Sequence, residues 1–150
     1  MDDGELITYG IFEAIGEDEI ERDHQLKVWL INMLAQWNVD LVALEGLQFQ
    51  EESAGRKMGV PVFQTLCRLQ GILMEVCYKR NIPYVICPTN TWRSSVGVKG
   101  RTRNDRKRSA QLLIKEEYGI LVSNDESDAI LIAKYASETN KRNPEYVEWE

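Results

Sequence analysis

The sequence has little of what most redox, zinc and hydrolase sites are built from. Its 150 residues include one histidine and three cysteines. Cys67, Cys77 and Cys87 are odd in number and contain no C-x-x-C pair, which argues against a disulfide framework and a zinc ribbon. No Ser/His/Asp set can be assembled around His24, which we expect at the surface. No G-x-G-x-x-G or Walker-type phosphate loop occurs either.

Long apolar runs are also absent. The longest ones, such as VDLVALEGL and YVICP, fall far short of the ~20 residues needed to cross a bilayer. The N-terminus reads MDDGELITYG, with acids where a secretory signal needs positive charge and an apolar stretch. We therefore expect a cytoplasmic protein without a membrane span. With 43% hydrophobic and 28% charged residues, the composition is typical of a folded chain.

The order of the hydrophobic patterns predicts an α/β fold with at least two parallel strands. We expect strands over 5–16, 38–47 and 81–88, the first entered from the turn at DDG, and helices over 23–37, 62–80, 105–118 and 127–137. Polar or irregular segments are expected at 50–59 and 89–104. The length fits a single domain over 1–150, with a core at 1–139 and a possible tail at 140–150.

Three carboxylates stand where chemistry is commonly placed. Glu45 ends the buried strand pattern, and sites in open α/β sheets form at the carboxyl ends of strands; alternatively, it is the first solvated residue after the strand. Asp125 and Asp128 are three apart at a helix start, where two like charges repel unless a cation lies between them. Helix capping is the alternative for this pair. Oxygen ligands without histidine or cysteine suit Mg²⁺ or Mn²⁺.

The basic charge is concentrated in one segment although the net charge is −6. A net negative charge argues against non-specific nucleic-acid binding by the chain as a whole. The local excess of positive charge makes such binding plausible for this segment. Trp92 could stack on a base, and Gly97 and Gly100 would make the loop flexible, so the segment is a candidate contact to a nucleic-acid backbone. A solvated surface is the alternative. The basic residues are Arg93, Lys99, Arg101, Arg103, Arg106, Lys107 and Arg108.

These motifs together resemble the RuvC-type Holliday junction resolvases and their RNase H-like relatives. The similarity runs from Glu5 to Ala136 through LVALEGLQF, YVICPTNTWRSSVGVKGRTRNDRKRSAQ and YGILVSNDESDAILIAKYA. It implies an RNase H-like mixed sheet flanked by helices and a metal-dependent endonuclease that cuts branched DNA, commonly as a dimer, with four acids around Mg²⁺. In that scheme Glu45 is the second carboxylate, Asp125 the third and Asp128 the fourth, and KGRTRNDRKR approaches the phosphate backbone.

One part of the family pattern is missing. The first family carboxylate lies in a D-x-G/S-x-x-x-T-G type motif on a central first strand, and this sequence has no such motif. By that alignment the fold is N-terminally truncated, lacking its first two strands, and Asp2 and Asp3 lie at the wrong end of the sheet to substitute. A missing central strand leaves unpaired sheet edges, which predicts a homodimer or larger oligomer.

Three functions remain in competition from the sequence. The first is an Mg²⁺-dependent endonuclease acting on branched DNA. The second is a catalytically incomplete DNA-binding domain of the same fold, favoured by the missing motif. The third is an α/β module that binds a protein or a small molecule, which would leave the basic segment without a role.

Overall fold

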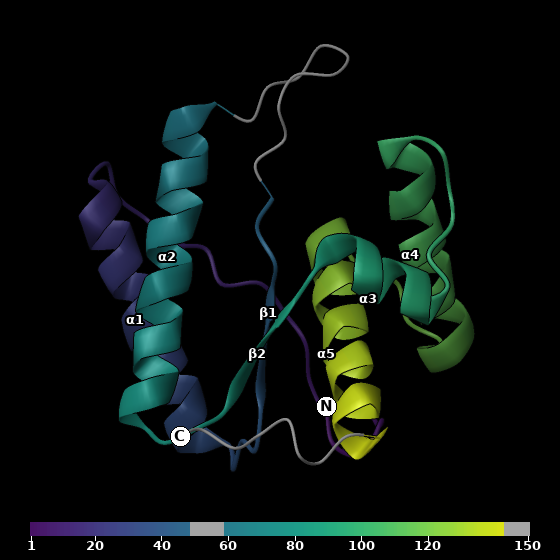
Figure 1. Ribbon diagram of the computed structural model, residues 1–150, viewed down its shortest axis with the longest axis horizontal. Helices are drawn as coiled ribbons and strands as arrows, with labels where there is room; N and C mark the ends of the chain where they lie inside the picture. Colours follow the sequence, from purple (N-terminus) through teal and green to yellow (C-terminus); the bar gives the residue numbers. More distant parts are fainter. Residues whose placement is uncertain (49–58, 143–150) are drawn as a thin grey trace. The chain divides into compact units, whose positions relative to one another are not determined.

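The computed structural model describes residues 1–48 and 59–142, with side chains described up to Asn140. The elements, shown in Figure 1, follow the order helix, strand, helix, strand and three helices. They are α1 (Glu19–Gln36), β1 (Val42–Glu45), α2 (Val60–Lys79), β2 (Tyr84–Cys87), α3 (Thr89–Val96), α4 (Arg103–Tyr118) and α5 (Asn124–Arg142). The chain forms two compact units: unit 1 comprises 1–11 and 86–150, and unit 2 comprises 12–85.

Unit 2 is built on the packing of α1 against α2, which lie side by side in Figure 1. Leu30 and Leu34 of α1 and Val76 of α2 are buried together, with a ring of half-buried aliphatic side chains around them. The strands β1 and β2 pair in parallel, and the backbone N–H of Val42 donates to the carbonyl of Pro83 at 3.0 Å beside them. The helices at 23–37 and 62–80 and the strands at 38–47 and 81–88 are confirmed, with shorter strands than expected.

The strand expected over 5–16 is not formed. Asp2 and Glu5 make an isolated bridge, and the residues that follow have no strand pairing within the described chain. Side chains of α1 satisfy part of this backbone instead: Gln25 bonds both the N–H and the carbonyl of Ile15, at 3.0 and 2.7 Å, and Arg22 donates to the carbonyl of Gly16 at 2.6 Å. β-forming residue types without a neighbouring strand remain an extended connection.

Unit 1 is a helical layer in which α5 packs on both α3 and α4. The apolar run after Asp128 supplies the buried face of α5, with Ile130, Leu131 and Ile132 all buried. The facing helices contribute Trp92 of α3 and Ile114 of α4, each 0% exposed. Burying an aromatic ring of this size is a large part of what holds the short helix α3 against its neighbours.

The segment expected to be irregular at 89–104 contains a helix, α3. Pro88 precedes its first turn, where a missing N–H costs nothing, and Gly97 ends it in the left-handed conformation with φ 87°. The signal was present in the sequence as Pro88 and Gly97 on either side of a buried Trp92. Burial of the Trp92 ring stabilises the helix, and the polar residues that neighbour Trp92 in the sequence do not indicate that burial.

Helix ends elsewhere follow their capping residues. Thr102 and Asp105 form a capping box at the start of α4, and Gly119 ends that helix with φ 70°, as expected. At its far end α5 continues to Arg142, so residues 140–142 are helical and not a tail. The expected tail from 143 and the expected polar loop at 50–58 lie outside the described residues.

Two expectations about residue types are also settled. His24 is exposed, as expected, and the cysteines are free thiols, with Cys77 and Cys87 buried. Burial raises the pKa of Cys87 to about 11, so that this thiol stays protonated at neutral pH. Among the described helices none is both long enough and apolar enough to cross a membrane.

Candidate functional site

The first turn of α5 carries two of the three candidate carboxylates. The helix begins at Asn124, earlier than the expected start, because Ser123 and Glu126 cap it. The N–H of Ser123 donates to Oε2 of Glu126 at 2.8 Å, and the N–H of Glu126 donates to Oγ of Ser123 at 3.3 Å. This is the reciprocal capping-box arrangement. Ser123 and Glu126 therefore supply these capping hydrogen bonds, and Asp125 also lies in the first turn, where the helix dipole favours an acid.

The two aspartates have different surroundings. Asp125 is exposed and makes no side-chain hydrogen bond or ion pair with the described residues. Asp128 faces Arg93 of α3, with Nη2 of Arg93 3.7 Å from Oδ2 of Asp128 and each side chain 29% exposed. The guanidinium of Arg93 also lies 5.2 Å from the centroid of the Trp92 ring. Trp92 and Arg93 thus place a positive charge beside one carboxylate of the pair.

Glu45 lies in unit 2, at the exposed end of β1. Its backbone carbonyl accepts a hydrogen bond from Nε2 of Gln70 on α2 at 3.1 Å, which ties the end of the strand to that helix. The position agrees with the expected carboxyl end of a strand. Among all the described residues, no three His, Cys, Asp or Glu side chains form a group that could hold a metal ion.

The donor chemistry on α5 fits a hard cation. Asp125 and Asp128 offer carboxylate oxygens alone, the ligands that Mg²⁺ and Mn²⁺ prefer, and Mg²⁺ needs only one or two protein carboxylates. The positive charge of Arg93 opposes a metal at Asp128, because it already supplies a counter-charge to that carboxylate. A cation bound at this turn would therefore share Asp128 with Arg93 or displace it.

The basic segment is held in a defined conformation on α4. The N–H of Lys99 donates to Oγ of Ser109 at 2.9 Å, and Nη1 of Arg106 donates to the carbonyl of Arg101 at 3.0 Å. Gly100 has φ 139° and lies so close to α4 that an added Cβ would approach the Cβ of Asp105 to 2.5 Å. The glycine therefore permits close packing of the loop on α4, and the expected flexibility of the loop stays a prediction.

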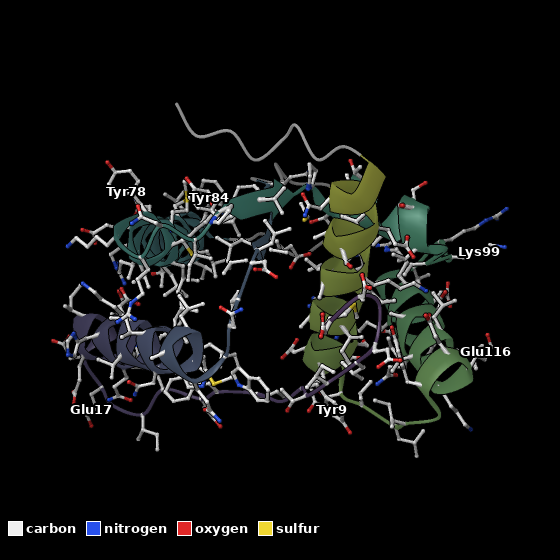
Figure 2. All side chains as sticks on the ribbon, turned by 90° about the horizontal axis from the view of Figure 1, so that it is seen from below. Tyr9, Glu17, Tyr78, Tyr84, Lys99 and Glu116 are labelled. Carbon is white, nitrogen blue, oxygen red and sulfur yellow. The ribbon has the colours of Figure 1, made fainter. Side chains whose placement is uncertain are left out.

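Most of the basic side chains point away from this support. Lys99, labelled in Figure 2, extends outward from unit 1. Arg101, Arg103 and Arg108 are also exposed, whereas Arg106 and Lys107 are half-buried. A fixed backbone with exposed cationic side chains is suited to contacting phosphates, because the charges are already gathered before binding.

Trp92 does not belong to that exposed surface. Its side chain is 0% exposed, and its indole N–H has no hydrogen-bond partner among the described residues. The expectation that Trp92 stacks on a base is therefore wrong for this structure, since a ring without exposed surface presents no face to a nucleotide. Its position supports the core and carries Arg93.

Supporting residues that sequence reasoning overlooked are mostly hydroxyls. Thr102 caps α4, Ser109 holds the basic loop, and Ser123 caps α5. Two of them had a readable signal, because Thr102 precedes Asp105 by three residues and Ser123 precedes Glu126 by three, which is the capping-box spacing. Ser109 had none, since its contact depends on the fold of the loop.

Comparison with other proteins identifies solved structures that have a similar fold. No family model and no curated protein sequence matches this chain. The described part is an α/β fold of five helices and a two-stranded parallel sheet. Solved structures of RuvC share it.

RuvC of Thermus thermophilus in complex with a Holliday junction substrate superposes with a TM-score of 0.67 at 12% sequence identity, over 87% of this chain and 76% of that one. A second Thermus thermophilus RuvC structure gives a TM-score of 0.62 at 13% identity, over 88% and 76%. The chain therefore has a RuvC-like fold, which confirms the family resemblance and the fold class at the level of the fold.

Proposed function

We propose that this chain is a metal-dependent endonuclease that cuts the phosphodiester bonds of branched DNA. Asp125 and Asp128 on α5 would hold Mg²⁺ or Mn²⁺, Glu45 at the end of β1 is the third acid that we propose for the reaction, and the basic segment would contact the backbone. The observation that carries the proposal is the first turn of α5, which brings the carboxylates of Asp125 and Asp128 together beside Arg93, while Ser123 and Glu126 make the capping hydrogen bonds. The RuvC-like fold supports the choice of substrate, because one solved relative holds a Holliday junction.

The proposed chemistry divides into three roles. A bound Mg²⁺ would stabilise charge on the phosphate that is cut. The carboxylates of Asp125 and Asp128 would bind and orient the cation, and Glu45 is the further acid proposed for the reaction. Arg93, held against Trp92, would neutralise Asp128 until the cation arrives and would then be free to contact a phosphate oxygen, since its guanidinium matches that geometry.

The test is cleavage of a labelled four-way junction beside a linear duplex, with Mg²⁺ and then Mn²⁺. Glu45→Gln, Asp125→Asn and Asp128→Asn should each lose cleavage by more than about 100-fold, the upper range for losing even an outer-shell partner of a metal site. Glu126→Gln is the matched control, because it removes the same charge from the same helical turn but from a capping residue. Full cleavage by the Glu45 and Asp128 variants would refute the assignment of these residues.

A catalytically incomplete DNA-binding domain is the second candidate. The observation favouring it is that the contacts fixing the basic loop, from Ser109, Arg106 and Gly100, involve none of the three candidate acids. DNA binding could therefore persist without catalysis. Salt-dependent junction binding with no cleavage in either metal would select this candidate, and no DNA affinity at low salt would refute both.

We also propose that the chain forms a homodimer through the extended residues of unit 1. Ile7, Tyr9 and Ile11 alternate along this segment and are 51%, 46% and 61% exposed, and they have no strand partner among the described residues. Pairing with a second copy would satisfy their backbone and cover their side chains. Light scattering that gives a monodisperse monomer at low concentration would refute the dimer. A cytoplasmic location stays a prediction.

A further inference from the structure

A cavity that none of the candidate nuclease residues lines lies in unit 2. It has a volume of about 690 Å³ and is formed by α1, the end of α2 and the residue Ile82 beyond it. This volume falls in the range of small-molecule sites, ~300–1,000 Å³. Every residue that lines it belongs to unit 2, whereas the basic segment belongs to unit 1. The lining residues are Lys27, Ile31, Leu34, Glu75, Val76, Lys79, Arg80 and Ile82.

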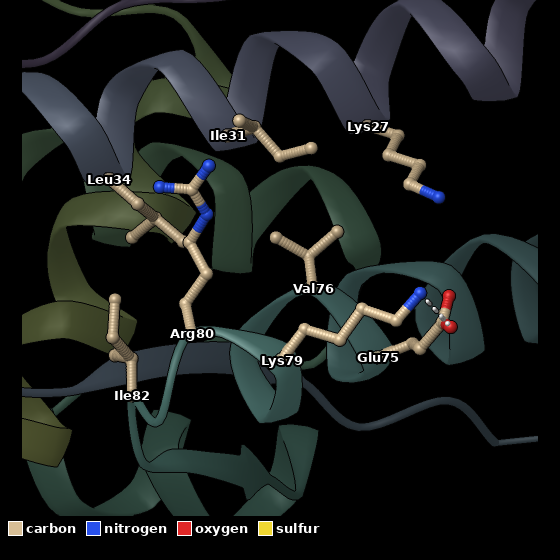
Figure 3. Close-up of a pocket in the computed structure, with 8 residues that line it drawn as sticks. All are labelled: Lys27, Ile31, Leu34, Glu75, Val76, Lys79, Arg80 and Ile82. Carbon is tan, nitrogen blue, oxygen red and sulfur yellow. Dashed lines mark ion pairs between the residues drawn. The ribbon is translucent and has the colours of Figure 1, made fainter.

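The lining combines a hydrocarbon floor with cationic ends. Figure 3 shows Ile31 and Val76 in the middle, with the guanidinium of Arg80 near Leu34 on one side and Lys27 on the other. Leu34 and Val76 are buried in the core of unit 2. The middle of the pocket is therefore apolar and rigidly packed, whereas its two ends carry positive charge.

The charges of the pocket do not cancel. Lys79 is paired with Glu75, with Nζ 3.0 Å from Oε1, and this hydrogen bond and the charges of Lys79 and Lys27 lower the pKa of Glu75. Lys27 and Arg80 make no ion pair within 4.0 Å among the described residues. Three cations, Lys27, Lys79 and Arg80, thus share the single carboxylate of Glu75 in the described lining, which leaves a net positive charge there.

Helix electrostatics explain only part of this arrangement. Cations near the C-terminal end of a helix are favourable, which accounts for Lys79 and Arg80 at the end of α2. Lys27 lies in the interior of α1 and gains nothing from that effect. Its counter-charge in the pocket is Glu75, which Lys79 already pairs, so one carboxylate serves two lysines and Arg80 has none in the described lining.

We propose that this pocket binds a small organic dianion whose two acidic groups flank a hydrocarbon body. Lys27 would pair with one acid and Arg80 with the other, while Ile31 and Val76 would cover the hydrocarbon between them. Burying the body against aliphatic side chains supplies affinity, and the two charges fix the orientation. The site is independent of the proposed nuclease function.

The experiment is a titration of the full chain with octanedioate, followed by the NMR signals of the methyl groups of Ile31, Val76 and Ile82. Octanoate retains one acid and 1,8-octanediol retains none, so the three compounds separate charge from hydrocarbon. We expect saturable shifts at these methyls, with octanedioate bound most tightly and octanediol least. Unmoved methyl signals, or equal affinity for octanedioate and octanediol, would overturn the proposal.

Substitutions of opposite sign distinguish binding from unfolding. Lys27→Gln and Arg80→Gln should each weaken octanedioate binding about two- to fivefold, the range of an exposed ion pair. Glu75→Gln should strengthen it by a similar factor, because it removes the only acid among the described residues of the lining. Lys115→Gln on α4 is the matched control and should leave the affinity unchanged. Weaker binding by Glu75→Gln, or no loss in the Lys27 and Arg80 variants, would contradict the assigned roles.

Discussion

The two units each gather cations, but they support them differently. In unit 1 the exposed arginines project from a loop and helix whose backbone is fixed by Gly100, Ser109 and a capping box. In unit 2 Lys27 and Arg80 stand at the ends of an aliphatic floor. A row of exposed cations suits the phosphates of a nucleic-acid backbone. Cations on either side of an apolar surface suit a small ligand that has an apolar body between charged ends. The same residue types therefore imply different ligands.

Of the changes considered, truncating the buried Trp92 side chain of unit 1 should lower the stability of the protein most. Trp92→Ala deletes a side chain that is 0% exposed, and the cavity should lower the free energy of unfolding by about 3–5 kcal/mol. Trp92→Phe should cost far less, because it keeps an aromatic ring and removes a buried N–H without a partner among the described residues. Urea unfolding followed by circular dichroism measures both. An equal loss for the two variants would show that the ring is not the central support.

The next largest effect should be on the salt dependence of DNA binding, which should change when the cations of unit 1 are removed but not when those of unit 2 are. The variant with Arg101→Gln, Arg103→Gln and Arg108→Gln should reduce the dependence of log K on log salt by about 0.9 for each phosphate that the protein no longer neutralises. The matched variant, with Lys27, Lys79 and Arg80 changed to Gln, removes the same charge and should leave that slope unchanged. Fluorescence anisotropy with a labelled junction at several salt concentrations measures the slopes. Equal changes in both variants would remove the distinction between the groups.

Much of the fold could be predicted from the sequence, because it follows local periodicity. The apolar spacing of α1, α2, α4 and α5 and the short runs around β1 and β2 correspond to the observed elements. The strand over 5–16 could not be judged in the same way, since a strand depends on a partner that its own residues do not contain. Residue types showed that this segment can be β, but not what lies beside it.

The candidate site shows the same limit at the level of single residues. Charge and spacing identified Asp125, Asp128 and the arginines, all of which lie at or near the surface as charged groups should. They failed for Trp92, because an aromatic residue inside a basic stretch is equally compatible with stacking on a base and with burial. Only the packing of α3 on α5 decides between these.

Two glycines should sharpen the comparison with smaller effects of opposite sign. Gly100→Ala places a Cβ 2.5 Å from that of Asp105 at φ 139°, and we expect it to lower the free energy of unfolding by about 1–3 kcal/mol and to weaken DNA binding. Gly71→Ala on α2 meets nothing within 4 Å and should raise stability by about 0.5–1 kcal/mol. Urea midpoints with unchanged m-values measure both. A stabilising Gly100→Ala would refute the close packing of the basic loop.

The smallest effect concerns one carboxylate from each unit. Hydrogen bonds from Thr102 lower the pKa of Asp105, with Arg108 a lesser cause, whereas the ammonium of Lys79 lowers that of Glu75. A lowered native pKa stabilises the fold fully above the unfolded value, ~4 for Asp and Glu, and this contribution is lost as the pH falls through the native pKa. Salt screens a charge pair at the surface more than a hydrogen bond to a hydroxyl and an amide. Carboxyl NMR titrations at low and at about 1 M salt should therefore show the Glu75 pKa returning toward its ordinary value while that of Asp105 stays low. If both return, Arg108 and not the capping box holds Asp105, and the basic segment owes its shape to charge.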